Sequence, residues 1–327
     1  MSEIISRLSR RDVLASVSGV AAAGLLGLTP TAALAAAPLQ GVLRPSIYRF
    51  KLGGFEITNI LDGYVQLDGP HPGYGNNQPA AVVQAYAQAH RLPPTRFENS
   101  YTNTVVNTGK ELVLFDTGNG TARLPTAGKL AALLATAGLQ PEQIDVVVIT
   151  HGHLDHIGGL GEGGKPTFPN ARYVFGEIEF DYWRKGENIA EARKANREQF
   201  MKVAAPLGEK ATFMKSESEV VPGIRAIEAF GHSPGHMAYH IESDGRRLLL
   251  WADTTNHAVM SLQQPEWYVG ADHDKDMGVA TRKKVLDMVA TDQIPAIGYH
   301  MPFPAVGYVE KANGAYRWAA ATYQMNL

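Results

Sequence analysis

The sequence predicts an α/β protein in which two stacked β-sheets carry helices on their outer faces, a four-layer arrangement. Each half of the chain contains several short apolar runs typical of strands, followed by a stretch with helical periodicity. The 33 glycines and 19 prolines supply the many turns that such short strands require. With 327 residues, 45% of them apolar, the chain can bury one large core or two fused half-domains. Two sheets packed face to face would allow both halves of the chain to bury their apolar residues in a shared core.

The first half of the chain alternates strand and helix signals. Apolar and polar residues alternate at its start, as in a half-buried strand, and a Gly/Pro/Asn loop over 69–79 precedes a short helix. The tetrapeptide Asn107-Thr108-Gly109-Lys110 marks a hairpin turn, and Gly138 ends a helical pattern. In chain order we expect strand structure at 47–60, a helix at 80–90, hairpin strands at 101–108 and 111–116, a helix at 124–137 and a buried Val/Ile-rich strand at 145–150.

The second half repeats this order of strands and helices. A charged, mostly helical stretch spans 177–203 and is expected to be interrupted near Gly186. Short apolar runs separated by turn residues predict strands around it. The remaining elements expected are strands at 172–175, 224–229, 237–241, 247–251 and 296–299 and a helix at 276–290.

The first 35 residues have the features of an export leader. Ser9-Arg10-Arg11-Asp12 is a twin-arginine pair, and a weakly hydrophobic run rich in Ala and Gly follows over 13–28. Ala33-Leu34-Ala35 offers a cleavage site. We therefore expect residues 1–35 to be a Tat signal peptide, residues 36–327 to form one catalytic domain, and the mature protein to be periplasmic or secreted. The alternative is an ordinary amphipathic N-terminal helix.

Composition excludes several classes of function. The formal net charge is −2 and no Lys/Arg run follows the leader, so a nucleic-acid-binding surface is not expected. The chain contains no cysteine, which excludes disulfides and thiolate metal ligands. The apolar run of the leader is too short and too rich in small residues for a membrane span, so stable membrane insertion after leader removal is not expected either.

Seven side chains with nitrogen or oxygen donors form the most informative pattern in the chain. Each lies just past a predicted strand end or in a loop close to one, where a rigid sheet can hold metal ligands in fixed positions. Nitrogen and oxygen donors suit borderline-hard divalent metals, and a pair of such metals activates water at neutral pH. The seven are His151, His153, Asp155, His156, His232, Asp253 and His300.

These motifs resemble those of the metallo-β-lactamase superfamily. The sequence His-x-His-x-Asp-His at 151–156 is followed by Gly-His-Ser-Pro-Gly-His at 231–236, a strand ending in Asp253 and the late His300. The resemblance implies an αββα sandwich and two divalent metal ions, zinc by default, although Mn, Co or Fe suit the same donors. It assigns His151, His153 and His232 to one metal, Asp155, His156 and His300 to the other, and Asp253 to both, with a hydroxide between the metals. Asp155 and Asp253 are thereby also the predicted catalytic residues.

Several branches of the superfamily can be set aside. The absence of cysteine excludes β-lactamases with a Cys ligand, and no inserted basic domain or flavodoxin domain is evident. The remaining branch contains lactonases, arylesterases and organophosphorus triesterases. The leader, the length and the spacings from His232 through Asp253 to His300 are similar to those of methyl parathion hydrolases and dihydrocoumarin hydrolases. That resemblance also makes a homodimer plausible.

Further residues are expected around the metals. Asp116 would orient a ligand histidine, unless it is only a turn residue, and His236 would pack behind the site. Phe180, Trp183, Trp267 and His257 are candidates for a substrate pocket, although aromatic residues at such positions also serve the core.

The polar His257 favours lactones and aryl esters over phosphotriesters as substrates. We therefore expect a small uncharged substrate and an exported hydrolase of lactones or aryl esters, with phosphotriesterase activity as a side reaction. The alternatives are an enzyme that acts mainly on phosphotriesters and a non-catalytic metal-binding protein.

Overall fold

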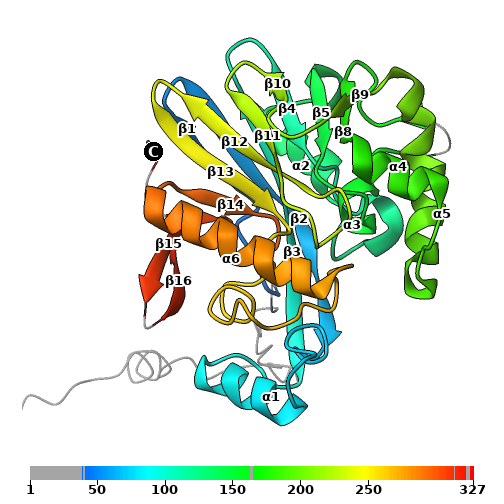
Figure 1. Cartoon of the computed structure of the whole chain (residues 1–327). Coiled ribbons are helices and arrows are strands. Elements are labelled where there is room, and N and C mark those ends of the chain that lie inside the picture. The colour runs from blue at the N-terminus through cyan, green and yellow to red at the C-terminus, as the bar shows by residue number, and fades with distance from the viewer. Residues whose placement is uncertain (1–38, 40, 163–164, 313, 322–324) are drawn as a thin grey trace, which may run out of the picture. The chain divides into compact units, whose positions relative to one another are not determined.

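A computed structural model describes residues 39, 41–162, 165–312, 314–321 and 325–327. The chain divides into two units, Met1–Leu43 and Arg44–Leu327. The predicted leader, residues 1–35, lies outside the described residues, and the few described residues of the first unit are exposed. The fold described below is that of the second unit (Figure 1).

The first sheet of this unit has seven strands in the order β1-β2-β3-β4-β5-β8-β9. Strands β1 to β4 pair antiparallel, whereas β4, β5, β8 and β9 run parallel to one another. A separate small hairpin, β6 and β7, follows the loop after β5. The bounds are β1 Ile47–Leu52, β2 Phe55–Asp68, β3 Arg96–Asn107, β4 Leu112–Phe115, β5 Val146–Ile149, β6 Gly161–Glu162, β7 Lys165–Pro166, β8 Arg172–Gly176 and β9 Thr212–Met214.

The second sheet also has seven strands, which follow the chain order from β10 to β16. Only β13 and β14 pair in parallel. The long helix α6, Lys275–Asp292, connects these two strands, as a parallel crossover requires. The bounds are β10 Glu219–Val221, β11 Ile224–Glu228, β12 Met237–Ser243, β13 Arg246–Ala252, β14 Ala296–Gly298, β15 Val306–Ala312 and β16 Ala315–Ala320.

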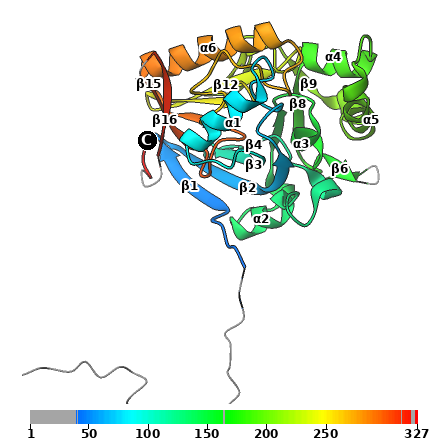
Figure 2. The same ribbon diagram turned by 90° about the horizontal axis from the view of Figure 1, so that it is seen from below.

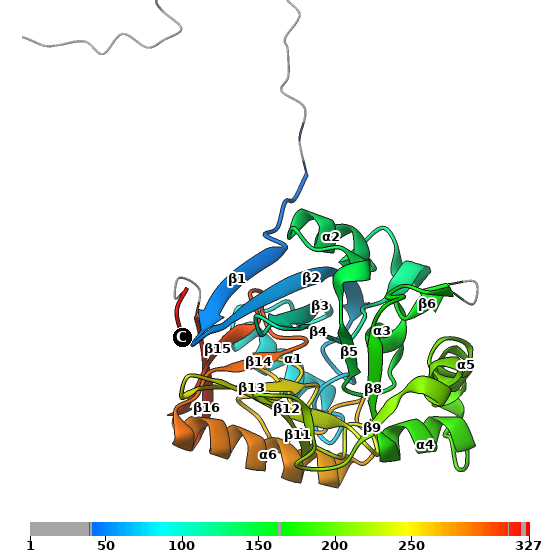
Figure 3. The same ribbon diagram turned by 90° about the horizontal axis from the view of Figure 1, so that it is seen from above.

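Helices flank the two sheets. Figures 2 and 3 show α2 beyond the first sheet and α6 beyond the second, on opposite sides of the molecule. None of the helices in the described ranges combines the length and hydrophobicity needed to cross a bilayer. The α-helices are α1 Ala80–Ala89, α2 Leu130–Thr136, α3 Leu154–Ile157, α4 Glu177–Lys185, α5 Lys194–Val203 and α6 Lys275–Asp292, and the short 3₁₀ helices are η1 Gly120–Arg123, η2 Pro141–Gln143, η3 Glu191–Arg193 and η4 Ala205–Lys210.

Strand β5 shows why the protein has layers. Val146 and Val148 belong to the core between the sheets, whereas Val147 and Ile149 belong to the core under α2, α4 and α5. Alternate residues of β13 divide in the same way between the central core and the core covered by α6. Both faces of these strands are buried, which explains their continuous apolar sequences. The predicted four-layer α/β sandwich is confirmed.

Two expected elements differ from the structure for local reasons. The alternating run 47–60 is a hairpin of β1 and β2, because the chain turns at Gly53, where φ is +56° and a Cβ would collide with the Ser243 carbonyl. The helix expected from residue 124 begins only at Leu130. The buried Asp62 carboxylate accepts the N–H groups of Gly128 and Leu130 and thereby fixes that start. The predicted interruption at Gly186 is confirmed, with φ at +70°.

Candidate metal centre

The seven predicted ligand side chains lie together beyond the ends of the central strands. The chain turns into His151 two residues after β5 ends, and it reaches Asp253 directly after β13 and His300 two residues after β14. Their donor atoms form three overlapping groups, within each of which all atoms lie within 4.8 Å of one another. The groups are His151, His153 and His232; His151, His156 and Asp253; and Asp155, His156 and His300.

Two of the five imidazoles are held by one carboxylate and one hydroxyl. Nδ1 of His156 donates to Asp116 over 2.7 Å. The Thr150 hydroxyl donates to the same carboxylate over 2.8 Å, so it can accept from Nδ1 of His151 at 3.1 Å. Asp116 has a φ of +57° and also accepts the Thr150 N–H, which locks its side chain between the two rings. Each ring therefore keeps its proton on Nδ1 and turns the lone pair of Nε2 toward the cluster.

The other three imidazoles are oriented by separate acceptors. His232 donates from Nδ1 to Asp272 at 2.9 Å, and His300 donates from Nδ1 to the Ser100 carbonyl at 2.7 Å. The ring of His153 is reversed: its Nδ1 faces the cluster and its Nε2 donates to Nε2 of His273 at 2.9 Å. Every ring thus has one nitrogen fixed by the protein and one free for a metal.

Distances within the cluster suit tetrahedral coordination. Nδ1 of His153 lies 2.9 Å from Nε2 of His151 and 3.0 Å from Nε2 of His232. Two nitrogens on one zinc at ordinary bond lengths are separated by about 3.3 Å. Asp253 lies between the two halves: Oδ2 is 3.3 Å from His232 and 3.0 Å from His300, and Oδ1 is 3.4 Å from His156.

Electrostatics also favour a cation in the cluster. Burial lowers the pKa of His151 and His153 well below the usual value, so both rings are neutral, as metal ligands must be. Burial alone would lower the pKa of His156 too, but the carboxylates of Asp253, Asp116 and Asp155 raise it well above the usual value. The carboxylates therefore favour a positive charge at His156, which a proton supplies in the metal-free protein and a bound metal ion would supply instead.

Nε2 of His156 and Oδ1 of Asp253 are buried and lie 3.4 Å apart, and neither atom makes a hydrogen bond within the described ranges of the chain. A buried donor or acceptor without a partner is costly, and a bound metal removes that cost for both atoms at once. The donor set is entirely nitrogen and oxygen, as zinc and other borderline-hard divalent ions prefer. The residues present therefore fit a divalent metal centre.

Comparison with known proteins identifies the family. The family model described as "Metallo-beta-lactamase superfamily" matches residues 98–278, which is more than half of the chain. The chain belongs to the metallo-beta-lactamase superfamily. The resemblance deduced from the motifs is confirmed.

Several individual relatives of this superfamily member are known. The N-acyl homoserine lactonase of Bacillus cereus is 21% identical over 179 residues, which cover 55% of this chain and 64% of that relative. The chain therefore spans less than two thirds of the length of this curated relative. AidC, described as a dizinc quorum-quenching lactonase in complex with a product, has a similar structure, with a TM-score of 0.77, 25% identity and coverage of 85% of this chain and 98% of AidC. AbOPH, described as a hydrolase in the beta lactamase superfamily, shares the fold, with a TM-score of 0.78 and 24% identity. The match covers 86% of this chain and 100% of AbOPH.

His236 lies behind the metal cluster of this metallo-beta-lactamase superfamily member. Its ring is fully buried, accepts the Asp253 N–H at Nε2 and donates from Nδ1 to the Ala229 carbonyl. Burial lowers its pKa to about 3, so the ring stays neutral. The side chain thereby fixes the backbone of Asp253.

Three aromatic residues expected in a substrate pocket lie in the core, and this corrects the sequence-based expectation. Phe180 and Trp183 are 3% and 0% exposed and pack with Phe200 under the first sheet. Trp267 is 7% exposed and packs against α1. Helical spacing in α4 directs the first two inward, and aromatic residues on a buried helix face pack in the core before they can line a cavity.

Three residues with important contacts were not anticipated from the sequence. The buried Glu179 accepts N–H groups of Gly152 and Gly235, which lie in the two histidine loops. Asp272 holds His232 and is itself paired with the buried Arg282 at 2.7 Å. His273, to which the sequence assigned no role, supports His153. The adjacent Asp272-His273 pair was the only available signal, and none marked Glu179.

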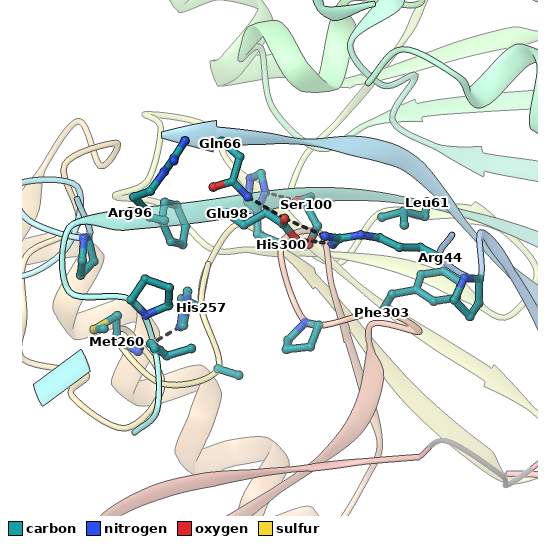
Figure 4. A pocket seen from close by; sticks show the side chains of 17 residues that line it. Arg44, Leu61, Gln66, Arg96, Glu98, Ser100, His257, Met260, His300 and Phe303 are labelled. Carbon is teal, nitrogen blue, oxygen red and sulfur yellow. Dashed lines mark hydrogen bonds and ion pairs between the residues drawn. The ribbon is translucent and has the colours of Figure 1, made fainter. Parts of the chain in front are cut away.

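Two cavities adjoin the cluster. One, of about 370 Å³, opens onto His153, Asp155, Asp253 and His300. The other, of about 580 Å³, has largely apolar walls and shares His300 with the first (Figure 4). One side of it carries Arg44, Gln66 and Glu98, joined by hydrogen bonds. The two cavities therefore share part of their wall beside the cluster.

His257 faces this second cavity, as Figure 4 shows. Its Nδ1 accepts the N–H groups of Val259 and Met260 at 3.0 and 3.2 Å, so the proton must be on Nε2. Burial lowers its pKa to about 4, which keeps the ring neutral. His257 thus offers one N–H donor to the cavity at neutral pH.

We expect His257 to weaken the fold in mild acid. The pKa of His257 is about 4 in the folded chain and about 6.5 when unfolded, so below pH 6.5 only the unfolded chain takes up the proton. The contribution of neutral His257 to the free energy of unfolding is complete above pH 6.5 and is lost as the pH falls toward 4. Between pH 7 and 5 the wild type should lose about 2 kcal/mol more unfolding free energy than His257→Gln, measured with urea. Equal losses in both proteins would contradict this assignment.

Proposed function

We propose that this protein is a binuclear metal-dependent hydrolase of neutral lactones and aryl esters. One observation carries the proposal: five buried imidazoles each turn one nitrogen toward a shared centre, while a protein acceptor holds the other nitrogen. A structural role needs no such set of aligned lone pairs, whereas metal-assisted hydrolysis does.

The ligand assignment follows from the overlapping groups of donor atoms. His151, His153 and His232 would hold one metal, and Asp155, His156 and His300 the other. Asp253 would bridge them, since its carboxylate approaches His232, assigned to the first metal, as well as His156 and His300, assigned to the second. Zinc is the proposed metal, because AidC, the relative with 25% identity, is described as dizinc.

Bound divalent metals would lower the pKa of a water molecule between them and polarise the scissile carbonyl. The protein supplies orientation. Asp116, Asp272 and Ser100 fix the ligand rings from behind, so that little reorganisation is needed during reaction. The Nε2–H of His257 can donate to a polar group on a substrate arm in the second cavity.

Lactones are the substrate class that the comparisons support best. The B. cereus relative is named an N-acyl homoserine lactonase, and AidC is described with a product, N-hexanoyl-L-homoserine. An adjoining chamber with largely apolar walls and a neutral N–H donor from His257 suits a lactone or ester with an extended arm. Phosphotriesters are uncharged too, and we propose their hydrolysis only as a side activity.

The test combines metal analysis with a substrate panel on the mature protein. We expect about two metal ions per chain and larger kcat/KM values for dihydrocoumarin or an N-acyl homoserine lactone than for methyl paraoxon. Removal of the metals with a chelator should abolish all of these activities together, and zinc should restore them. A large preference for the phosphotriester would overturn the lactonase proposal. Bound metals without turnover on any substrate would indicate a non-catalytic metal-binding protein.

Export through the Tat route remains part of the proposal. It rests on the twin arginines Arg10 and Arg11 and the small-residue cleavage site in the sequence. Fractionation of cells should recover the mature enzyme outside the cytoplasm, and lysine at both arginine positions should retain it inside. Retention of the unchanged protein in the cytoplasm would argue against export.

A further inference from the structure

Two arginines line the cavity that opens onto the metal cluster. Arg123, at the end of η1, and Arg193, at the end of η3, share this cavity with His153, Asp155 and His300. Both side chains are half-buried. They come from segments far apart in the sequence, so their presence at one cavity is a result of the fold.

Neither guanidinium is paired with a carboxylate in the described part of the chain. Arg193 donates to the Ala271 carbonyl, and Arg123 donates to the Tyr101 hydroxyl and lies 5.1 Å from the centroid of its ring. In contrast, the fully buried Arg282 behind the site is paired with Asp272. Each guanidinium has five N–H donors, so several remain available at Arg123 and Arg193.

The charges around this cavity favour an anionic group. Its carboxylates are Asp68, which is exposed, and Asp155 and Asp253, which the proposed function assigns to the metals. Burial lowers the pKa of Arg193, because its charge is partly desolvated and the nearby carboxylates of Asp272 and Asp155 offset this effect only in part. A planar carboxylate accepts two parallel N–H bonds from a guanidinium and would compensate that loss of hydration.

We propose that Arg123 and Arg193 form a carboxylate-binding subsite at the metal cavity. This inference rests on the proposed function and extends it, because it adds an anionic group, on the substrate or on the product, to the neutral esters and lactones proposed above. The carboxylate has two possible sources: a charged arm that the substrate carries, or the acid released when the lactone or ester is hydrolysed. The oxygen of water bonds to the carbonyl carbon, the bond to the leaving oxygen breaks, and one proton of the water passes to that oxygen to give an alcohol or phenol. The new carboxylic acid then loses its proton to solvent. The subsite holds the resulting anion or orients one already present.

The first experiment measures binding directly, by calorimetry on the metal-loaded protein. The probes are 3-(2-hydroxyphenyl)propanoate, the acid formed from dihydrocoumarin, and the corresponding neutral alcohol. Arg193→Met should weaken binding of the carboxylate roughly tenfold to a hundredfold more than binding of the alcohol. Arg193→Lys should restore part of the affinity, because it keeps the charge without the planar fork. Arg184→Met removes the same charge from the exposed end of α4 and serves as the matched control.

Kinetics then distinguish the two sources of the carboxylate. If the substrate carries it, Arg193→Met and Arg123→Met should raise KM for mono-4-nitrophenyl succinate at least about tenfold more than KM for 4-nitrophenyl acetate. If the reaction generates it, the variants should instead weaken inhibition by the product acid. Equal effects on charged and neutral probes in both experiments, with unchanged metal content, would overturn the subsite. A wild type that binds the acid through Arg193 but hydrolyses no ester would overturn only the proposed function.

Discussion

Asp253→Asn is expected to lower kcat/KM roughly a thousandfold or more for every substrate and to reduce the metal content below two ions per chain. The Asp253 carboxylate reaches both halves of the cluster, because Oδ2 lies 3.3 Å from Nε2 of His232 on one side and 3.0 Å from Nε2 of His300 on the other. An amide keeps the shape but removes the negative charge and one oxygen donor. Metal analysis and the substrate panel check both effects on the same preparation.

The matched control is Asp244→Asn, which makes the same chemical change at an exposed turn between β12 and β13. Its φ of +50° is tolerated by asparagine, so the fold and the metal content should be retained. If Asp253→Asn kept one activity while losing another, the two reactions would take place at different centres. Full metal content with full activity would exclude Asp253 as the bridging group.

Glu179→Ala is expected to lower the unfolding free energy by about 3–5 kcal/mol. The Glu179 carboxylate is 2% exposed and accepts four hydrogen bonds, from the N–H groups of Gly152 and Gly235, the Ser233 hydroxyl and Nε1 of Trp183. Alanine leaves these buried donors without an acceptor. Because three of them, on Gly152, Ser233 and Gly235, belong to the loops that carry the ligand histidines, metal affinity should also fall, roughly tenfold to a hundredfold.

Denaturation in urea, with and without added zinc, separates the two consequences. Glu177→Ala, two residues earlier at an exposed position of α4, is the control and should change stability little. Glu179→Gln keeps one carbonyl acceptor and should fall between the wild type and the alanine variant. If Glu179→Ala were as stable as Glu177→Ala, the carboxylate would not be what joins the two loops.

The layers and the positions of the donor side chains were predictable from the sequence because they depend on local patterns. Residues 146–149 are apolar throughout, which identifies a strand buried on both faces, and His151 follows after Thr150. Contacts between segments far apart in the sequence were harder to predict. Strands β15 and β16 were not expected, and the start of α2 depends on a carboxylate more than sixty residues away in the sequence.

The sequence by itself therefore determined the fold class and the identity of the metal-ligand candidates. Spacing within a strand or a short motif is a local property, and seven nitrogen and oxygen donors placed after strands define one kind of chemistry. Only the tertiary structure decided which partners hold those donors and which aromatic residues are buried. Such contacts join segments that are distant in the sequence, so the residues on either side of each position do not reveal them. Glu179 joins the two histidine loops in this way, and Arg123 and Arg193 line the same cavity.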